Sequence, residues 1–332
     1  MTPTRPRRVT ATDVAKAAGV SRSAVSRAFT DGAYLDQDKK TRILKVSQDL
    51  GYRPNAFAAG LQKTQSNIVA VVAGEMRSHY DHELVDHLLK ELVAIGKWPI
   101  VLSGQEISDT PNLHGIFGFP VDAMIVRGGS VDEFVVESCA KLQIPLIFSG
   151  CVVDAEHVDS VSCRNFEGMY ALANLLAETG RRKIAYIDGL PNRASKQERP
   201  AGARAGLANN GLAFVDTETA DFSYEGGYRA AIALMKKNDL DAIMCANDET
   251  ALGAITAVRQ ELGLRVPEDV AITGFDDLRM SDWPNFRLTT ARNPTEETVA
   301  AIVRLLSERL EDPNKVGETV LLDADVVKRE TH

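Results

Sequence analysis

Long apolar runs are missing from this 332-residue sequence, although 44% of its residues are hydrophobic. No stretch approaches the roughly 20 apolar residues of a membrane-spanning helix. The basic start, which contains Arg5, Arg7 and Arg8, leads into a polar helix instead of the apolar core of a secretion signal. We therefore expect a cytoplasmic, multidomain globular protein.

Cysteine is also scarce, and the chain contains only Cys139, Cys151, Cys163 and Cys245. Their spacings match no zinc or redox motif, and so few cysteines cannot form a disulfide framework in a chain of this length. We expect buried thiols, with no bound metal and no cofactor.

Signature motifs of several enzyme classes are absent as well: there is no nucleophile elbow, no phosphate-binding loop and no HExxH sequence. The carboxylate pairs Asp248-Glu249 and Asp276-Asp277 leave acid–base catalysis or a metal site open as an alternative. We favour a protein that is not an enzyme, in which these acids bind ligand hydroxyls or cap helices.

Charge is distributed unevenly along the chain. Residues 1–63 contain twelve Lys and Arg against five Asp, a net charge of +7, whereas the remainder contains 26 basic and 41 acidic residues, a net charge of −15. A cationic head suits a polyanion, because each neutralised phosphate releases counterions. The head is therefore the expected nucleic-acid end.

Residues 12–29 predict two short helices that meet at a tight turn. Thr12 and Asp13 provide oxygens for the start of the first helix. Gly19 supplies the positive φ that ends it, and Ser21 can cap the second helix, which turns Val25 inward. The outward side chains of the second helix are then Arg22, Ser23, Ser26 and Arg27. This is the helix-turn-helix pattern of DNA-binding domains, although an ordinary αα-hairpin is an alternative.

A third helix over residues 36–50 completes the predicted head. Its Ile43, Val46 and Leu50 can share a small core with the second helix, and Gly51 ends it. Pro54 keeps its predecessor extended, so a new element starts at residue 55. Residues 55–61 can form two helical turns, but so short a segment folds only when something holds it.

From residue 67 onward, apolar strands alternate with amphipathic helices. The expected strands are residues 68–72, 99–102, 123–126, 145–148, 184–187, 242–246 and 270–275. The expected helices are residues 83–95, 132–142, 167–179, 200–210, 226–236, 250–262 and 294–310. This alternation predicts a doubly wound α/β fold with buried parallel sheets in two subdomains, and ligands bind beyond the carboxyl ends of such strands.

Several motifs are more specific than this pattern. In the head they are residues 13–21 (DVAKAAGVS), 25–27 (VSR) and 50–55 (LGYRPN), followed by Ala58, Ala59 and Leu61. In the body they are residues 180–185 (GRRKIA), 199–202 (RPAG), 246–249 (ANDE), 251–253 (ALG), 266–277 (VPEDVAITGFDD) and 288–290 (LTT). In this order, and over essentially the whole chain, they resemble the LacI/GalR family of bacterial transcriptional regulators.

The resemblance implies an all-α helix-turn-helix head, a hinge helix and a two-subdomain sensor similar to periplasmic sugar-binding proteins. The expected limits are 1–54 for the head, 55–66 for the hinge, 67–165 with 292–322 for the first subdomain, and 166–291 with 323–332 for the second. The chain ends at His332 without the leucine-heptad tail of tetrameric members, so we expect a homodimer.

The resemblance also implies which residues contact DNA. Arg22 and Ser23 match positions that select bases, and Arg27 matches a base or phosphate contact. An arginine at this position predicts a guanine in each half-site, although a phosphate contact or a solvated charge is the alternative for Arg22. Phosphate contacts are expected for Thr10, Ser21, Ser26 and Tyr52. In the hinge, Asn55 starts the helix, Ala58 permits close approach to its mate, and Leu61 would wedge into the minor groove.

For the sensor, the resemblance implies an effector held between the subdomains. The implied residues are Glu75, Tyr80 and Asp81 from the first subdomain, Arg193, Arg199, Phe222, Asn247 and Asp276 from the second, and Asn293 from a crossover. Alternatively, Arg199 only forms a salt bridge with Asp276, and Asp248 only caps a helix.

Two departures from the family pattern bear on the effector. Gly150 and Arg164 stand where many members have aspartates. Removing a carboxylate and adding a guanidinium would make the cleft less suited to a neutral sugar and more suited to an anionic one.

The sequence therefore predicts a sequence-specific DNA-binding transcriptional regulator, a repressor, that acts in the cytoplasm at the nucleoid. Its expected partners are palindromic operator DNA, a second copy of the chain, and a sugar, sugar acid or sugar phosphate that controls operator affinity allosterically. The alternatives are a solute-binding protein, or a sugar-processing enzyme, built on the same two-lobed fold.

Overall fold

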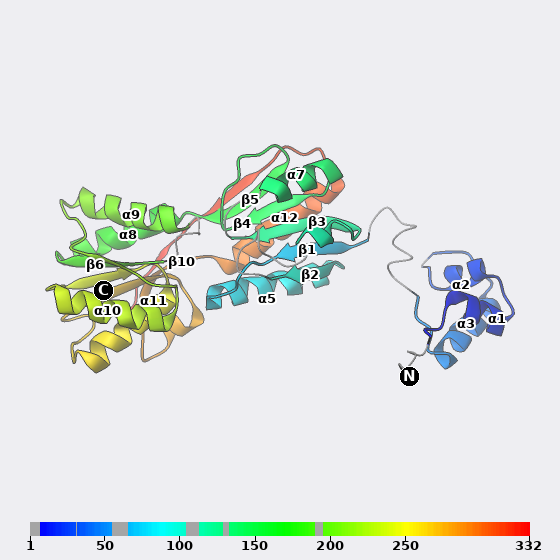
Figure 1. Ribbon diagram of the computed structural model, residues 1–332, viewed down its shortest axis with the longest axis horizontal. Coiled ribbons are helices and arrows are strands. Elements are labelled where there is room, and N and C mark those ends of the chain that lie inside the picture. Colours follow the sequence, from blue (N-terminus) through cyan, green and yellow to red (C-terminus); the bar gives the residue numbers. More distant parts are fainter. Residues whose placement is uncertain (1–6, 31, 55–65, 104–112, 129–132, 190–194) are drawn as a thin grey trace, which may run out of the picture. The chain divides into compact units, whose positions relative to one another are not determined.

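The computed structural model describes residues 7–30, 32–54, 66–103, 113–128, 133–189 and 195–332 (Figure 1). The chain forms two compact units, Met1–Ser66 and Asn67–His332, which we call the head and the body. Within the described ranges, no helix is long and apolar enough to cross a membrane.

The head contains three helices, α1 (Ala11–Ala18), α2 (Arg22–Ala28) and α3 (Gln37–Asp49). Val14, Val25 and Ile43 are fully buried between them. As predicted, Gly19 ends α1 with a φ of +64°, and the Ser21 side chain caps α2. The geometry is therefore that of two short helices joined by a glycine turn and supported by a third.

Two details of the head differ from the sequence prediction. Thr10, not Thr12, caps α1, because its hydroxyl accepts a hydrogen bond from Asp13 N over 3.4 Å and the Asp13 carboxylate accepts one from Thr10 N over 2.8 Å. Hydrogen bonds from Thr10 and Arg7 lower the pKa of Asp13 to about 2. Leu50 is 40% exposed as the C-cap of α3 and does not join the core.

The first sheet of the body has the strand order β11-β5-β4-β3-β1-β2, and all neighbouring strands are parallel. Its strands are β1 (Ile68–Val72), β2 (Trp98–Leu102), β3 (Val121–Arg127), β4 (Leu146–Ser149), β5 (Val158–Cys163) and β11 (Thr319–Leu322). One face packs on α5 (His79–Ala94) and α12 (Thr295–Glu311). The other face packs on α6 (Leu113–Ile116) and α7 (Glu133–Leu142).

The second sheet has the order β12-β10-β9-β8-β6-β7. Its strands are β6 (Ile184–Asp188), β7 (Thr217–Thr219), β8 (Ala242–Cys245), β9 (Ala271–Asp276), β10 (Thr289–Arg292) and β12 (Val326–Val327). The helices α8 (Asn165–Glu178) and α9 (Ser195–Asn209) cover one face, and α10 (Tyr224–Lys237) and α11 (Asp248–Thr256) cover the other. The predicted doubly wound class is confirmed, except that β12 runs antiparallel to β10.

Five strands, β5, β7, β10, β11 and β12, were not predicted. β7, β11 and β12 are short edge strands with the sequences TET, TVLL and VV, too short to show a strand pattern. β5 is fully buried although its sequence, VDSVSC, contains three polar residues. It tolerates this burial because Asp159 forms an ion pair with Arg309 of α12, which lies 150 residues later in the chain.

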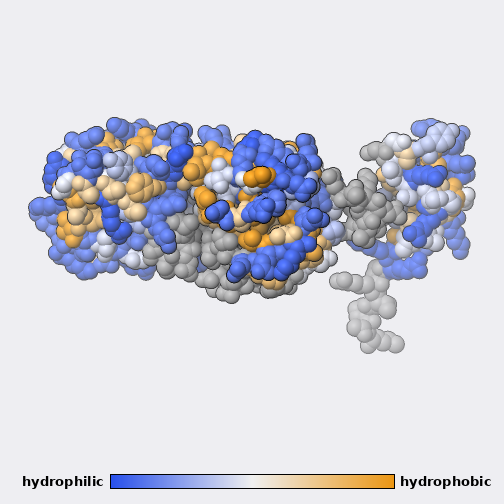
Figure 2. Space-filling view, turned by 90° about the horizontal axis from the view of Figure 1, so that it is seen from above, coloured by the Kyte–Doolittle hydropathy of each residue, from blue (hydrophilic) through white to orange (hydrophobic). Residues whose placement is uncertain are grey.

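The chain passes from one sheet to the other between β5 and α8, between β10 and α12, and between β11 and β12. Figure 1 shows the two sheets of the body with these connecting segments between them. Charged and polar residues cover most of the face of the body seen in Figure 2, and apolar residues form patches among them. The carboxyl ends of β3, β4, β5, β8 and β9 contribute to one cavity within the body.

Candidate functional site

The exposed side of α2 carries the residues predicted to read DNA. Arg22, Ser23, Ser26 and Arg27 are all exposed, whereas Val25 is buried on the opposite side of the helix. The Ser21 hydroxyl accepts a hydrogen bond from Ala24 N. It also lies 2.9 Å from the Ser23 hydroxyl, within hydrogen-bond distance. The helix therefore presents two guanidinium groups and three hydroxyl groups to solvent from one short segment.

The remaining predicted DNA contacts are placed differently. The Thr10 hydroxyl is engaged at the start of α1 and donates to Asp13 Oδ2 over 2.7 Å. Tyr52 packs its ring edge against Phe29, with a centroid distance of 5.9 Å, and stays partly exposed. Asn55, Ala58 and Leu61 of the predicted hinge lie outside the described residues.

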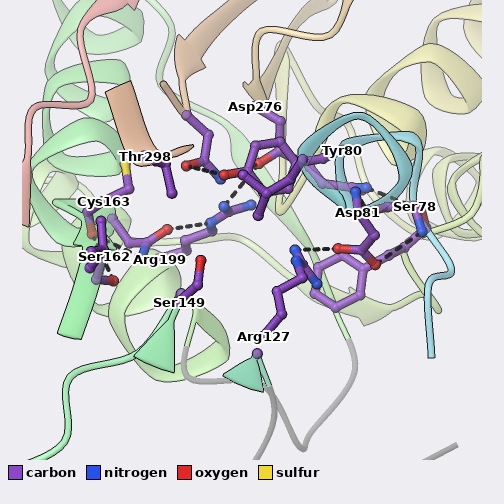
Figure 3. Close-up of a pocket in the computed structure, with 18 of the residues that line it drawn as sticks. Ser78, Tyr80, Asp81, Arg127, Ser149, Ser162, Cys163, Arg199, Asp276 and Thr298 are labelled. Atoms are coloured by element: carbon purple, nitrogen blue, oxygen red, sulfur yellow. Dashed lines mark hydrogen bonds and ion pairs between the residues drawn. The ribbon is translucent and has the colours of Figure 1, made fainter. Parts of the chain in front are cut away.

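A cavity of the body gathers most of the predicted effector residues (Figure 3). Of the nine, it is lined by Tyr80, Asp81, Arg199, Phe222, Asn247, Asp276 and Asn293. The other lining residues are Arg77, Ser78, Leu84, Arg127, Gly128, Ser149, Gly150, Val161, Ser162, Cys163, Asn165 and Thr298. The cavity thus draws side chains from both sheets and from the segments that connect them.

Arg199 and Asp276 form a buried ion pair in the cavity wall. Arg199 Nη2 donates to Asp276 Oδ1 over 3.0 Å, Nε donates to Asn165 Oδ1 over 2.9 Å, and Nη1 donates to Ala246 O over 2.6 Å. The guanidinium also lies 3.7 Å from the ring centroid of Phe275. All three nitrogens of Arg199 therefore have partners, and one of these partners is Asp276, with which the salt bridge was predicted.

Asp276 occupies an unusual position at the end of β9. Its φ is +124°, a value that L-residues rarely adopt, and the surrounding contacts hold it there. Burial raises the pKa of Asp276, whereas Arg199 and Asn293 oppose this shift. The carboxylate is thus positioned by a guanidinium and an amide before any ligand arrives.

Tyr80 connects α5 to the segment after β10. Its hydroxyl donates to Asn293 Oδ1 over 2.9 Å, and Asn293 Nδ2 donates to Asp276 Oδ1 over 3.2 Å. Burial raises the pKa of Tyr80, so the phenol stays protonated and acts as a donor. This chain of hydrogen bonds links the helix packed on the first sheet to a strand end of the second sheet.

Two of the predicted effector residues, Glu75 and Arg193, are not among the described residues of the cavity wall. Of the two positions that depart from the family pattern, Gly150 and Arg164, only Gly150 is found there. Glu75 pairs with Arg77 over 2.6 Å and does not line the cavity, and Arg193 lies outside the described residues. The prediction for Arg164 is wrong, because its guanidinium pairs with Asp323 over 3.1 Å outside the cavity.

Eight polar or thiol residues of the wall were not among the predicted effector residues: Arg77, Ser78, Arg127, Ser149, Ser162, Cys163, Asn165 and Thr298. Arg127 and Ser149 stand at predicted strand ends, which is a signal that could have identified them. Ser162 and Cys163 belong to β5, which was not predicted as a strand. The pKa of Cys163 is raised to about 12 by burial, so its thiol stays protonated.

Asp248 and Glu249, considered as possible catalytic acids or helix caps, have other partners. Asn247 caps α11, and Asp248 accepts hydrogen bonds from Leu278 N over 2.8 Å and from the Ser281 hydroxyl over 2.6 Å. Glu249 Oε1 lies 2.9 Å from His79 Nδ1. Among the residues that the structure describes, no group of three or more His, Cys, Asp or Glu is arranged to hold a metal ion.

Two protein families match parts of the chain. Residues 10–55 match the bacterial regulatory proteins of the lacI family, and residues 173–332 match the periplasmic binding protein-like domain. Catabolite control protein A of Priestia megaterium is 29% identical over 307 residues, which cover 90% of this chain and 92% of that protein. The probable HTH-type transcriptional repressor ExuR of Bacillus subtilis (strain 168) is 26% identical over 327 residues, which cover 97% of this chain and 98% of that protein.

Solved structures agree over nearly the full length. The crystal structure of the lac repressor dimer bound to operator and the anti-inducer ONPF matches with a TM-score of 0.87 and 24% identity, covering 98% of this chain and 99% of that one. The complex of the transcriptional regulator CelR with cellobiose matches with a TM-score of 0.73 and 26% identity, covering 98% and 100%. The chain is therefore a DNA-binding transcriptional regulator in which a LacI-family helix-turn-helix domain is followed by a periplasmic-binding-protein-like domain.

Proposed function

We propose that this regulator binds a palindromic operator as a homodimer, and that a small molecule in the cavity of the body changes its affinity for that operator. The observation that carries the proposal is the composition of the cavity, which takes residues from both sheets and from the crossovers between them. A ligand there contacts both subdomains, so it can favour one closure state over another. The coupling then acts equally in both directions.

In the head, we assign base contacts to Arg22 and Ser23 and a base or phosphate contact to Arg27, because α2 exposes all three. Thr10, Ser21, Ser26 and Tyr52 are assigned to phosphates, which give affinity and register. Arg22 selects a guanine in each half-site. In the proposed hinge of residues 55–66, Asn55, Ala58 and Leu61 contact the minor groove.

The domain limits follow the three crossovers. The head is 1–54, the first subdomain of the sensor is 67–165 with 292–322, and the second is 166–291 with 323–332. Within this division, effector contacts are assigned to Tyr80, Asp81, Arg199, Phe222, Asn247, Asp276 and Asn293, which line the cavity. Glu75 and Arg193 complete the proposed set.

An exposed apolar strip supports the homodimer. It consists of Val93, Ile95, Trp98 and Val101, which are 61%, 41%, 68% and 39% exposed and lie at the end of α5 and on the edge strand β2. Large apolar side chains beside an unpaired sheet edge favour association. One matching structure is of a dimer bound to operator, and a second copy of this chain is the proposed cover for the exposed strip.

We assign the carboxylates of the cavity to binding and not to catalysis, because each is engaged by an arginine, an amide or a backbone N–H. A sugar or a sugar derivative is the proposed effector, as in the CelR complex with cellobiose. A relative named as a probable repressor supports repression as the output. Binding to chromosomal operators would place the protein at the nucleoid.

Fluorescence anisotropy tests the proposal. The full chain is titrated into labelled DNA from upstream of its own and neighbouring genes, at a stated salt concentration, with and without sugars and sugar acids. Tight, salt-sensitive binding to one palindrome that a single compound shifts is the expected result. Loss of specificity at one base position in Arg22→Ala would support the assigned readout, whereas no specific binding by the intact protein would refute the proposal.

A further inference from the structure

Arg127 and Ser149 place unpaired polar groups in the cavity wall. Arg127 ends β3, and Ser149, its register partner, ends the neighbouring strand β4. Arg127 Nε and Nη1 and the Ser149 hydroxyl are buried and have no hydrogen-bond partner among the described residues. Buried polar groups normally have partners, so an unpaired cluster that lines a cavity indicates a ligand that supplies them.

The Arg127 side chain is held in place by contacts that leave these nitrogens free. Nη2 forms an ion pair with Asp81, and the guanidinium lies 5.5 Å from the ring centroid of Tyr80 (Figure 3). Asp81 is itself fixed at the start of α5, where it accepts hydrogen bonds from Arg77 N over 3.2 Å and Ser78 N over 3.3 Å. Arg127 is only 9% exposed, so the guanidinium is preorganised at a fixed point.

Several acceptors of the cavity are already engaged. Asp276 Oδ1 accepts from Arg199 and Asn293, and the side-chain oxygens of Asn165, Asn293 and Asn247 accept from Arg199, Tyr80 and Thr250 N respectively. A neutral sugar presents hydroxyl hydrogens that need acceptors, whereas an anionic group needs only donors. The free groups of this wall therefore favour an anion.

We propose that the effector carries a carboxylate or phosphate group and that Arg127, assisted by Ser149, binds it. This inference rests on the proposed function of the cavity as the effector site. The lining residues include three arginines, Arg77, Arg127 and Arg199, against two carboxylates, Asp81 and Asp276. An anionic oxygen adds a direct charge–charge attraction to the hydrogen bond from a guanidinium, so the anion uses Arg127 better than a hydroxyl does.

Isothermal titration calorimetry on the full chain tests this inference with matched compounds. The carboxylate arm compares D-glucuronate with D-glucose, D-galacturonate with D-galactose, and D-gluconate with D-glucitol. The phosphate arm uses glucose 6-phosphate and fructose 6-phosphate. At least one anion is expected to bind at least about tenfold more tightly than its neutral partner, and the arm in which it falls identifies the group.

Two variants locate the binding group. Arg127→Gln and Ser149→Ala are expected to weaken binding of the anion, Arg127→Gln by about tenfold or more. Arg164→Gln removes a guanidinium that pairs with Asp323 outside the cavity, and it serves as the control with unchanged affinity. Melting temperatures verify that the variants are folded, and Ser149→Ala, which removes one oxygen, keeps the test valid if Arg127→Gln does not fold.

Three results would overturn the inference: neutral compounds that bind as tightly as their acids, no anion of the panel that binds, or anion binding that neither variant weakens. If a neutral sugar alone shifts operator binding in the anisotropy assay, the anion is excluded while the proposed regulator function stands. If an anion binds as expected but the protein recognises no operator, the proposed function fails while the binding chemistry stands.

Discussion

Replacing Asp159 with asparagine is expected to destabilise the body by about 3–5 kcal/mol, because it breaks a fully buried ion pair. The side chains of Asp159 and Arg309 are 0% and 1% exposed. Arg309 donates to Asp159 Oδ2 from Nε over 3.0 Å and to Oδ1 from Nη2 over 2.7 Å, and Glu318 N donates to Oδ1 over 2.9 Å. Asparagine keeps the volume but leaves the guanidinium buried without its countercharge.

Urea unfolding followed by tryptophan fluorescence measures this loss. The chain has two tryptophans, Trp98 and Trp283, and both belong to the body, so the signal excludes the head. For a unit of this size the expected loss corresponds to a melting temperature lower by roughly 6–20 °C. The double variant Asp159→Asn/Arg309→Met is expected to recover part of the loss, because the unpaired guanidinium is gone.

Arg304→Gln is the matched control on the same helix. Arg304 pairs with Glu308 and Glu318, but its side chain is 44% exposed, so its loss should cost less than about 1 kcal/mol. The prediction would be refuted if the free energy of unfolding of Asp159→Asn lay within about 1 kcal/mol of that of the unmodified protein, or if Asp159→Asn lost no more stability than Arg304→Gln. The buried ion pair would then not be what stabilises β5.

Three further changes have defined outcomes. Thr10→Ala should destabilise the head by about 0.5–2 kcal/mol through loss of the α1 cap, and circular dichroism melting should show no comparable effect for Thr12→Ala. Burial and Asp276 raise the pKa of Asp248 from 3.8 to about 7, so the folded body binds an extra proton and its stability falls as the pH rises through that interval. Asp248→Asn should flatten the dependence of the melting temperature on pH over this interval, and an unchanged dependence would contradict the raised pKa of Asp248. Gly253→Ala should destabilise the body by about 1–3 kcal/mol, measured by urea unfolding, because a Cβ there would lie 2.0 Å from Tyr224 O where α10 and α11 meet, and unchanged stability would mean that the two helices can separate freely.

The head could be predicted almost entirely from local sequence. Gly19 and Ser21 mark the turn and the second cap, and neither depends on distant parts of the chain. The misplaced cap of α1 shows the limit of such signals, because Thr10 and Thr12 are chemically identical and only the capping box with Asp13 distinguishes them. The exposed face of α2 follows from helical periodicity alone.

The candidate effector site was predicted less completely. The resemblance to the LacI/GalR family indicated seven residues that do line the cavity, although their roles stay predictions. It misassigned Arg164, whose guanidinium direction depends on Asp323. It also passed over Arg127 and Ser149, because their pairing depends on the register of two strands and their unpaired atoms depend on the surrounding burial.

By itself, the sequence determined the helix-turn-helix head, the doubly wound class of the body and the strands with continuous apolar runs, such as β1, whose predicted limits are those observed. Local periodicity and capping are short-range properties, so they can be read from neighbouring residues. Only the tertiary structure decided that the polar strand β5 is buried, because the countercharge of Asp159 comes from Arg309. Only the tertiary structure brought Arg127 beside Asp81 and left its Nε and Nη1 buried without a hydrogen-bond partner among the described residues, since burial and pairing between distant residues are set when the elements pack.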